Sequence, residues 1–165
     1  MSPSKRLALG IIILLSLSGF ILGAEALRAR LWKPPEGASL APGDVPVYLN
    51  GIFAASFSPQ DLEDQRQANF VDVEEGKTQD GWPLRDVLLR LLPEEALLPG
   101  STVRVSSSSR GKSVDLSWEQ VERTENMVVF DLSGRGTLKL VSLLEQLDIR
   151  DEWIQDVDRI EVIMP

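Results

Sequence analysis

From residue 45 onward, short apolar runs alternate with polar residues, which is the pattern of half-buried β-strands. Val45, Val47 and Leu49 alternate in this way, and the following pair, Asn50-Gly51, is typical of a two-residue hairpin turn. Further runs of this kind are NFVDVEE, STVRV, KSVDLSW, MVVFDLSG, the start of TLKLVSLL and the closing RIEVIM. The pattern predicts about seven short strands.

Helical spacing is limited to a few short segments. Apolar residues recur every three or four positions over residues 84–92, until Pro93 ends the helix. Ser58, which stands directly before a proline, and Ser117 are typical N-cap residues of two shorter helices. These elements predict an α+β domain over residues 45–165 with a mixed or antiparallel sheet.

The segment SSSSRGKS, residues 106–113, matches most of the phosphate-binding loop G-x-x-x-x-G-K-[ST] but lacks its first glycine. That loop requires a helix beginning at the Lys-Ser pair, whose amide groups hold the phosphates. Here Val114, Leu116 and Trp118 alternate with polar residues instead, which favours a second strand. We therefore predict a β-hairpin and no binding of nucleotides.

The N-terminal segment contains seventeen uncharged residues, from Leu7 to Gly23. A run of this length and character is typical of a membrane anchor, but Ala24-Glu25-Ala26 also suits cleavage of an export signal. We predict that residues 1–33 are an anchor or signal and that residues 34–44 are a Pro/Gly-rich linker. The body is then extracytoplasmic, in the periplasm or at the cell surface, and it is secreted if the segment is cleaved.

The amino-acid composition limits the partners and the catalytic groups that the chain can have. The net charge is −8, and from residue 34 onward we count 24 acidic against 12 basic side chains, so nucleic acid is not an expected partner. The chain has no cysteine and no histidine, which excludes thiolate nucleophiles, imidazole bases and the usual zinc or haem ligands. We predict no catalytic residue and no metal ligand, and we interpret the paired acidic residues as solvated surface charge.

Five segments occur in an order that resembles a known family: LNGIFAASFSPQDL, DGWPLRDVLLRLL, VRVSSSSRGKSVDLSW, GRGTLKLVS and WIQDVDRIEVI. Together they are similar to the molybdopterin-binding domain of the sulfite oxidase family, over roughly residues 45–164. The resemblance implies a sulfite-oxidase-like fold and the cofactor molybdopterin. It also implies that Arg135 and Lys139, near a glycine turn, hold an anion such as the pterin phosphate; the other interpretation is that they are ordinary surface charges.

Catalytic members of that family bind molybdenum through a cysteine thiolate, which this chain lacks. We therefore predict a non-catalytic, membrane-tethered binding or accessory domain, without a cofactor, that takes a small anionic ligand or a membrane-protein partner. The alternative is a molybdopterin-dependent oxidoreductase or its cofactor-binding subunit. We expect Trp82, Trp118 and Trp153 to pack in the core or at an edge and not to form a ligand-stacking platform.

Overall fold

The computed structural model describes residues 40–165, so the predicted anchor and most of the linker lie outside the described residues. The strands are β1 (Val45–Leu49), β2 (Ile52–Phe57), β3 (Ala68–Val71), β4 (Thr78–Pro83), β5 (Thr102–Ser107), β6 (Lys112–Ser117), β7 (Val129–Leu132), β8 (Leu138–Val141), β9 (Ile154–Gln155) and β10 (Arg159–Ile163). The α-helices are α2 (Leu84–Leu91) and α3 (Trp118–Glu122), and the 3₁₀ turns are η1 (Pro59–Leu62), η2 (Glu94–Ala96), η3 (Thr124–Asn126) and η4 (Glu145–Leu147). Over residues 40–165, no helix has the length and apolar character needed to cross a bilayer.

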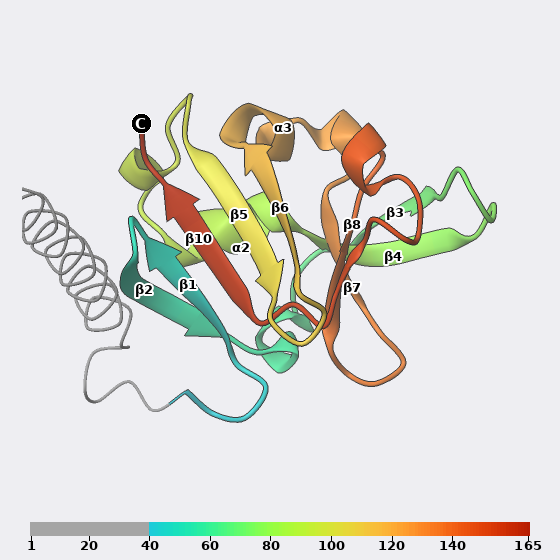
Figure 1. Ribbon diagram of the computed structural model, residues 1–165, viewed down its shortest axis with the longest axis horizontal. Helices are drawn as coiled ribbons and strands as arrows, with labels where there is room; N and C mark the ends of the chain where they lie inside the picture. The colour runs from blue at the N-terminus through green and yellow to red at the C-terminus, as the bar shows by residue number, and fades with distance from the viewer. Residues whose placement is uncertain (1–39) are drawn as a thin grey trace, which may run out of the picture. The chain divides into compact units, whose positions relative to one another are not determined.

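The ten strands form two five-stranded sheets, with α2 and α3 packed beside them (Figure 1). The first sheet has the order β2-β1-β10-β5-β6, and the second has the order β3-β4-β7-β8-β9. Neighbouring strands are antiparallel except β1 and β10, which are parallel with Val47 opposite Ile160. The first and last strands of the described residues are therefore adjacent in the first sheet.

The predicted α+β class is wrong, because the described residues are mostly β-sheet with only two short α-helices. The largest error concerns β4, TQDGWP, whose glycine and proline suggested a loop leading into a helix. Its neighbours β3 and β7 nevertheless hold it as a central strand, and Gly81 is needed there because β7 approaches so closely. The predicted N-terminal hydrophobic helix lies outside the described residues.

The hairpin predicted for residues 106–113 is confirmed. Strands β5 and β6 pair antiparallel with Ser107 opposite Lys112, and the turn between them closes with a hydrogen bond from the Gly111 amide to the Ser108 carbonyl oxygen (3.2 Å). Gly111 has φ +61°, a conformation that glycine adopts without strain. Because a strand and not a helix follows Lys112, the amide arrangement of a phosphate loop is not formed.

Most of the core is a single cluster that draws on both sheets and on α2. Helix α2 buries Leu84, Val87 and Leu88 in it, and Phe130 of β7 is its largest fully buried side chain. Each fully buried apolar side chain contributes about 1.5–3 kcal/mol. Within helix α2, only Asp86 and Arg90 are fully exposed to solvent.

The three tryptophans within the domain are buried, as predicted. Trp82 and Trp118 belong to the main core cluster, and Trp153 packs with Phe70 and Val141 in a smaller one. Their exposed fractions are 4%, 4% and 6%, respectively. No broad indole face is therefore open to a stacked ligand at these three positions.

Candidate functional site

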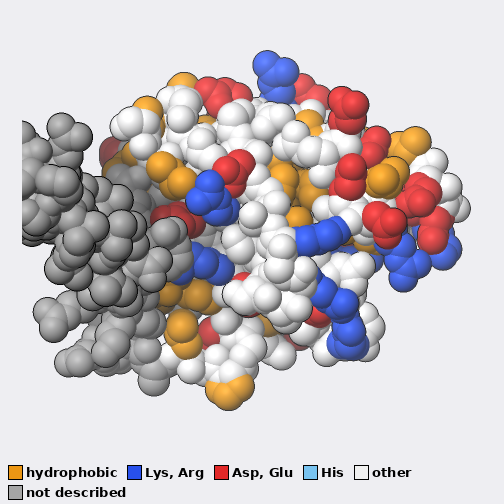
Figure 2. Space-filling view, viewed as in Figure 1, with side chains coloured by type: hydrophobic (Ala, Val, Ile, Leu, Met, Phe, Trp, Pro, Cys, Tyr) orange, Lys and Arg blue, Asp and Glu red, His pale blue; other side chains and the backbone are white. Residues whose placement is uncertain are grey.

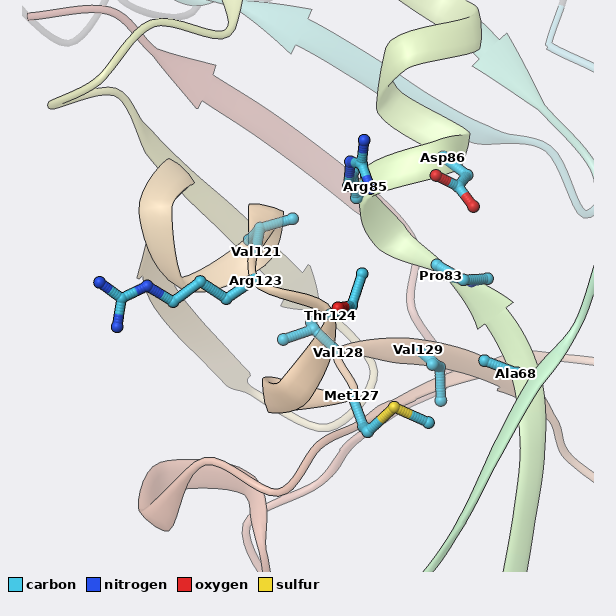
Figure 3. A pocket seen from close by; sticks show the side chains of 10 residues that line it. All are labelled: Ala68, Pro83, Arg85, Asp86, Val121, Arg123, Thr124, Met127, Val128 and Val129. Atoms are coloured by element: carbon cyan, nitrogen blue, oxygen red, sulfur yellow. The ribbon is translucent and has the colours of Figure 1, made fainter.

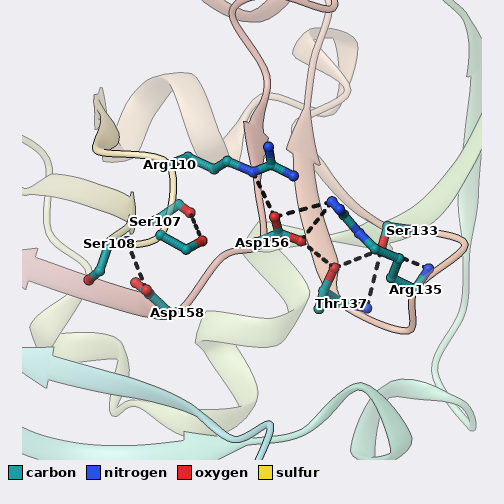
Figure 4. A network of polar contacts seen from close by, with 9 residues as sticks. Ser107, Ser108, Arg110, Ser133, Arg135, Thr137, Asp156 and Asp158 are labelled. Carbon is teal, nitrogen blue, oxygen red and sulfur yellow. Dashed lines mark hydrogen bonds and ion pairs between the residues drawn. The ribbon is translucent and has the colours of Figure 1, made fainter.

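The segment between β9 and β10 carries the carboxylate on which three side chains converge. Asp156 accepts hydrogen bonds from Arg110 Nε (2.7 Å), from the Thr137 hydroxyl (2.8 Å) and from Arg135 Nη2 (3.2 Å) (Figure 4). Asp156 itself has φ +56°, which aspartate tolerates better than most residues. Through Asp156, the β5–β6 turn, the β7–β8 turn and the β9–β10 segment are held together.

The charge at this junction is not balanced. Hydrogen bonds from the Thr137 hydroxyl and from Arg110, and the positive charge of Arg135, hold the pKa of the Asp156 carboxyl below its usual 3.8. The carboxyl is therefore ionised at neutral pH, and two guanidinium groups share its single negative charge. One positive charge is left over at the surface.

A second aspartate, Asp158, fixes the β5–β6 turn from the same side. Its carboxylate accepts a hydrogen bond from the Ser108 amide (2.7 Å), and its own amide donates to the Ser106 carbonyl oxygen (3.0 Å). The hydroxyl groups of Ser107 and Ser109 also share a hydrogen bond of 3.3 Å. The serine-rich turn is thus a rigid platform, and it presents the two cations that follow it, Arg110 and Lys112.

Beside this platform lies a groove of about 170 Å³, which we call the basic groove. It is lined by Arg110, Lys112, Arg150, Asp151, Trp153 and Gln155. The Lys112 ammonium donates to the Asp151 carbonyl oxygen, and Arg150 Nη1 lies 3.5 Å from Glu75 Oε1. Figure 2 shows basic side chains over the region of β6, β8 and β9, with acidic side chains beyond them. All three cations of the groove are exposed to solvent.

The structure places the two predicted anion-binding residues in different surroundings. Arg135 is 62% exposed and extends from the β7–β8 turn to Asp156 at the edge of the basic groove. Lys139 is only 18% exposed; its ammonium lies 2.9 Å from Asp131 Oδ2, 3.0 Å from Gln79 Oε1 and 4.8 Å from the centre of the Trp153 ring. The protein itself thus surrounds the Lys139 ammonium, and neither residue lines the groove.

Lys139 belongs to a chain of polar contacts within the second sheet. The Gln79 side chain that accepts from Lys139 donates in turn to Asp72 Oδ2 (3.0 Å). Asp72 also accepts the amide of Glu75 (2.6 Å), and this bond is the main reason that its pKa lies below the usual value. These bonds link β8 and β4 to the β3–β4 turn, so the geometry indicates a structural role for Lys139.

The cations that do line the basic groove were not singled out from the sequence as a ligand site. Arg110 and Lys112 lie in SSSSRGKS, whose pattern predicts a β-hairpin and does not indicate a ligand site. Arg150 is about forty residues further along the chain, and nothing in the strand pattern indicates that it returns to this hairpin. The only available signal was local, namely two cations flanking a glycine in a predicted turn.

The residues near Arg135 and Lys139 do not match a thiolate-ligated molybdenum centre. The whole chain lacks cysteine, and within residues 40–165 no group of three or more acidic, histidine or cysteine side chains is arranged to hold a metal ion. The basic groove is also smaller than the roughly 300–1,000 Å³ of most cofactor and ligand sites. Molybdopterin therefore stays a prediction of the resemblance.

Neither a scan of the chain against protein-family models nor a search among curated proteins gave a match.

Proposed function

We propose that residues 45–165 form a non-catalytic extracytoplasmic binding or accessory domain, tethered through the N-terminal segment, whose basic groove takes a small anionic ligand. One observation carries this proposal. Three exposed cations, Arg110, Lys112 and Arg150, line one groove of a domain that has 22 acidic and only 12 basic side chains. On such a surface, a local cluster of positive charge directs anions to one place.

The geometry of the groove supports a compact anion. Guanidinium groups form paired, charge-assisted hydrogen bonds with phosphate or carboxylate oxygens, and the Lys112 ammonium adds a further positive charge. A volume of about 170 Å³ suits an anionic group of a few heavy atoms. Because Asp156 and Asp158 fix the turn, binding does not require the turn to become ordered.

The chemistry of the chain supports binding without catalysis. General bases and nucleophiles at neutral pH are most often histidine and cysteine, and the chain contains neither. The cations of the groove are donors only, so they stabilise negative charge but do not abstract a proton at neutral pH.

Calorimetric titration of the full-length protein in a nonionic detergent with pyrophosphate tests the proposal. We expect binding that weakens at least about tenfold, or about 1.4 kcal/mol, in the double variant Lys112→Gln/Arg150→Gln. The control is Arg90→Gln/Arg104→Gln, which removes two positive charges outside the groove and leaves the affinity unchanged. Equal affinity in both double variants, or no heat of binding in the unchanged protein, contradicts the proposal.

Elemental analysis distinguishes the proposed binding domain from the alternative, a molybdopterin-dependent oxidoreductase or its cofactor-binding subunit. Under the proposal, protein produced with a full supply of molybdenum cofactor purifies with far less than stoichiometric molybdenum. Molybdenum near one atom per chain favours the alternative instead.

A further inference from the structure

A second groove lies on another part of the domain, beside the first turn of α2. It has a volume of about 460 Å³, which is within the range of small-molecule sites. Its walls come from the residues just before and at the start of β3, from the β4–α2 junction and from the segment after α3. Figure 3 shows an adjoining hollow that shares Ala68, Pro83, Arg85, Asp86, Thr124 and Met127 with this groove. Arg85 and Asp86 project from α2, and Met127 lies on the segment before β7. We call this second groove the Arg85 groove.

The two cations of the Arg85 groove, like Arg123 on the adjoining segment, differ from the other basic side chains of the domain. Nine of the twelve basic side chains of residues 40–165 have a hydrogen bond or an ion pair, including the three cations of the basic groove. Arg66 and Arg85, which both line the Arg85 groove, have none within the described part of the chain. Two unpaired guanidinium groups in so acidic a domain are unexpected, because carboxylates are plentiful.

Buried donors at the β4–α2 junction also lack acceptors. Arg85 Nε and the indole Nε1 of Trp82 are buried nitrogen atoms without a hydrogen-bond partner in the described structure. Leaving a buried donor unsatisfied costs about 1–3 kcal/mol, so such groups are rare in native proteins. The buried Nε is closed to a ligand, so a carboxylate in the groove would be held by the terminal nitrogen atoms of the Arg85 guanidinium, which are not among the buried unpartnered atoms.

The wall opposite Arg85 is apolar and includes a strained residue. Met127 has φ +48° and ψ +46°, the left-handed conformation that a methionine rarely adopts. The Met127 amide donates to the Thr124 carbonyl oxygen (3.2 Å), and the Asn126 carbonyl oxygen accepts from the Leu143 amide (2.9 Å), which holds the segment in place. This strained turn places the flexible thioether of Met127 on the groove wall, which also includes Ala68 and Pro83.

From these features we propose that the Arg85 groove binds a monoanionic organic acid with an apolar body. The guanidinium groups of Arg66 and Arg85 take the carboxylate, and the apolar wall takes the hydrocarbon or aromatic part. Asp86, the single acidic side chain on the groove, leaves a net charge of +1 there, which matches one negative charge better than two. This ligand class differs from the compact, multiply charged anion expected at the basic groove.

The experiment compares two probes with the same aromatic body and different head groups: 4-phenylbutyrate, whose carboxylate is negatively charged, and 4-phenylbutyramide, its uncharged amide. Each is titrated calorimetrically into the full-length protein against a detergent-matched blank. We expect the acid to bind at least about tenfold more tightly than the amide, a difference of about 1.4 kcal/mol. Equal affinity for both probes, or no binding of the acid, overturns the proposal.

Variants locate the site. Arg66→Gln/Arg85→Gln is expected to weaken binding of the acid at least about tenfold while leaving the weak binding of the amide unchanged. The control Arg90→Gln/Arg104→Gln keeps full affinity, and thermal unfolding verifies that each variant is folded. If Arg85→Gln prevents folding, Arg66→Gln alone still weakens binding of the acid, because Arg66 is exposed and has no hydrogen bond or ion pair within the described residues. Unchanged affinity in Arg66→Gln and in the double variant refutes the site.

The two grooves are tested independently. The basic-groove variant Lys112→Gln/Arg150→Gln is expected to lose affinity for pyrophosphate and to keep its affinity for 4-phenylbutyrate. The variant Arg66→Gln/Arg85→Gln is expected to show the reverse. If one variant loses binding of both probes while it remains folded, the proposal of two separate sites is contradicted.

Discussion

Replacing Asp156 by asparagine tests whether this side chain holds the β5–β6, β7–β8 and β9–β10 segments together. Asparagine has nearly the same shape and also tolerates a positive φ, so the backbone conformation at +56° is kept. The negative charge is lost, and with it the charge-assisted bonds from Arg110, Arg135 and Thr137. The variant therefore isolates the electrostatic part of the junction.

The expected loss of unfolding free energy depends on how exposed the side chains that bind Asp156 are. Arg110 and Arg135 are 41% and 62% exposed, so each pair contributes only about 0.2–1 kcal/mol in water. The bond from the partly buried Thr137 hydroxyl to a charged acceptor contributes about 1.5 kcal/mol. We expect Asp156→Asn to lower the free energy of unfolding by about 2–3 kcal/mol, which lowers Tm by roughly 10 °C for a domain of this size.

The assay is thermal unfolding followed by circular dichroism at several pH values, with Asp151→Asn as a control on an exposed side chain. The pKa of Asp156 is lowered by folding, so its stabilising effect is complete above its unfolded value near 3.8 and is lost as the pH falls through the folded value. The difference between the unchanged protein and Asp156→Asn is therefore largest at neutral pH and shrinks in acid. A difference that is absent at pH 7, or that does not change with pH, refutes the reasoning.

Three further outcomes are expected. Gly81→Ala places a Cβ 2.3 Å from the Phe130 carbonyl oxygen, which is backbone that cannot move aside, so the variant loses about 3 kcal/mol or more in denaturant unfolding or fails to fold; an unchanged midpoint contradicts the close approach. Ser117→Ala removes the N-cap hydroxyl that accepts a hydrogen bond from the Gln120 amide (3.2 Å), and it lowers the free energy of unfolding by about 1 kcal/mol. The control Ser113→Ala, at a serine that caps no helix, has little effect. Equilibrium dialysis shows that ATP and GTP bind no more tightly than inorganic triphosphate, because residues 106–113 form a hairpin turn and not a nucleotide loop; tighter binding of either nucleotide than of triphosphate overturns that assignment.

The hairpins and short helices were predictable because their signals are local. Asn50-Gly51 adopts the two positive φ values that such a turn requires, at +49° and +80°. The alternation of β5 and β6 and the cap at Ser117 are likewise properties of a few adjacent residues. In each case the sequence and the structure agree because no distant contact is needed to decide the outcome.

The fold class and the grooves depend on contacts that no local pattern records. Strand β4 contains Asp80, Gly81 and Pro83, all poor strand formers, yet it pairs on both edges because β3 and β7 satisfy its backbone. From the sequence, Lys139 was predicted to bind an anion or to be a surface charge. In the structure, Asp131 lies opposite Lys139 in β7 and forms an ion pair with it. Tertiary pairing thus changed both the class of the fold and the role assigned to a residue.

Asp156 stabilises the turns, but it also competes with any anion bound in the basic groove. Its replacement therefore distinguishes a structural role of this residue from a role in ligand binding. The carboxylate occupies donors of Arg110 that an anion in the basic groove would also use, so a bound anion competes with Asp156. Asp156→Asn removes this competitor and raises the local charge by one unit. As long as the turn stays ordered through Asp158, pyrophosphate should therefore bind the variant more tightly although the variant unfolds more easily. A variant that loses both stability and affinity shows instead that Asp156 orders the groove for its ligand, and a variant that loses stability alone limits the junction to holding the turns together.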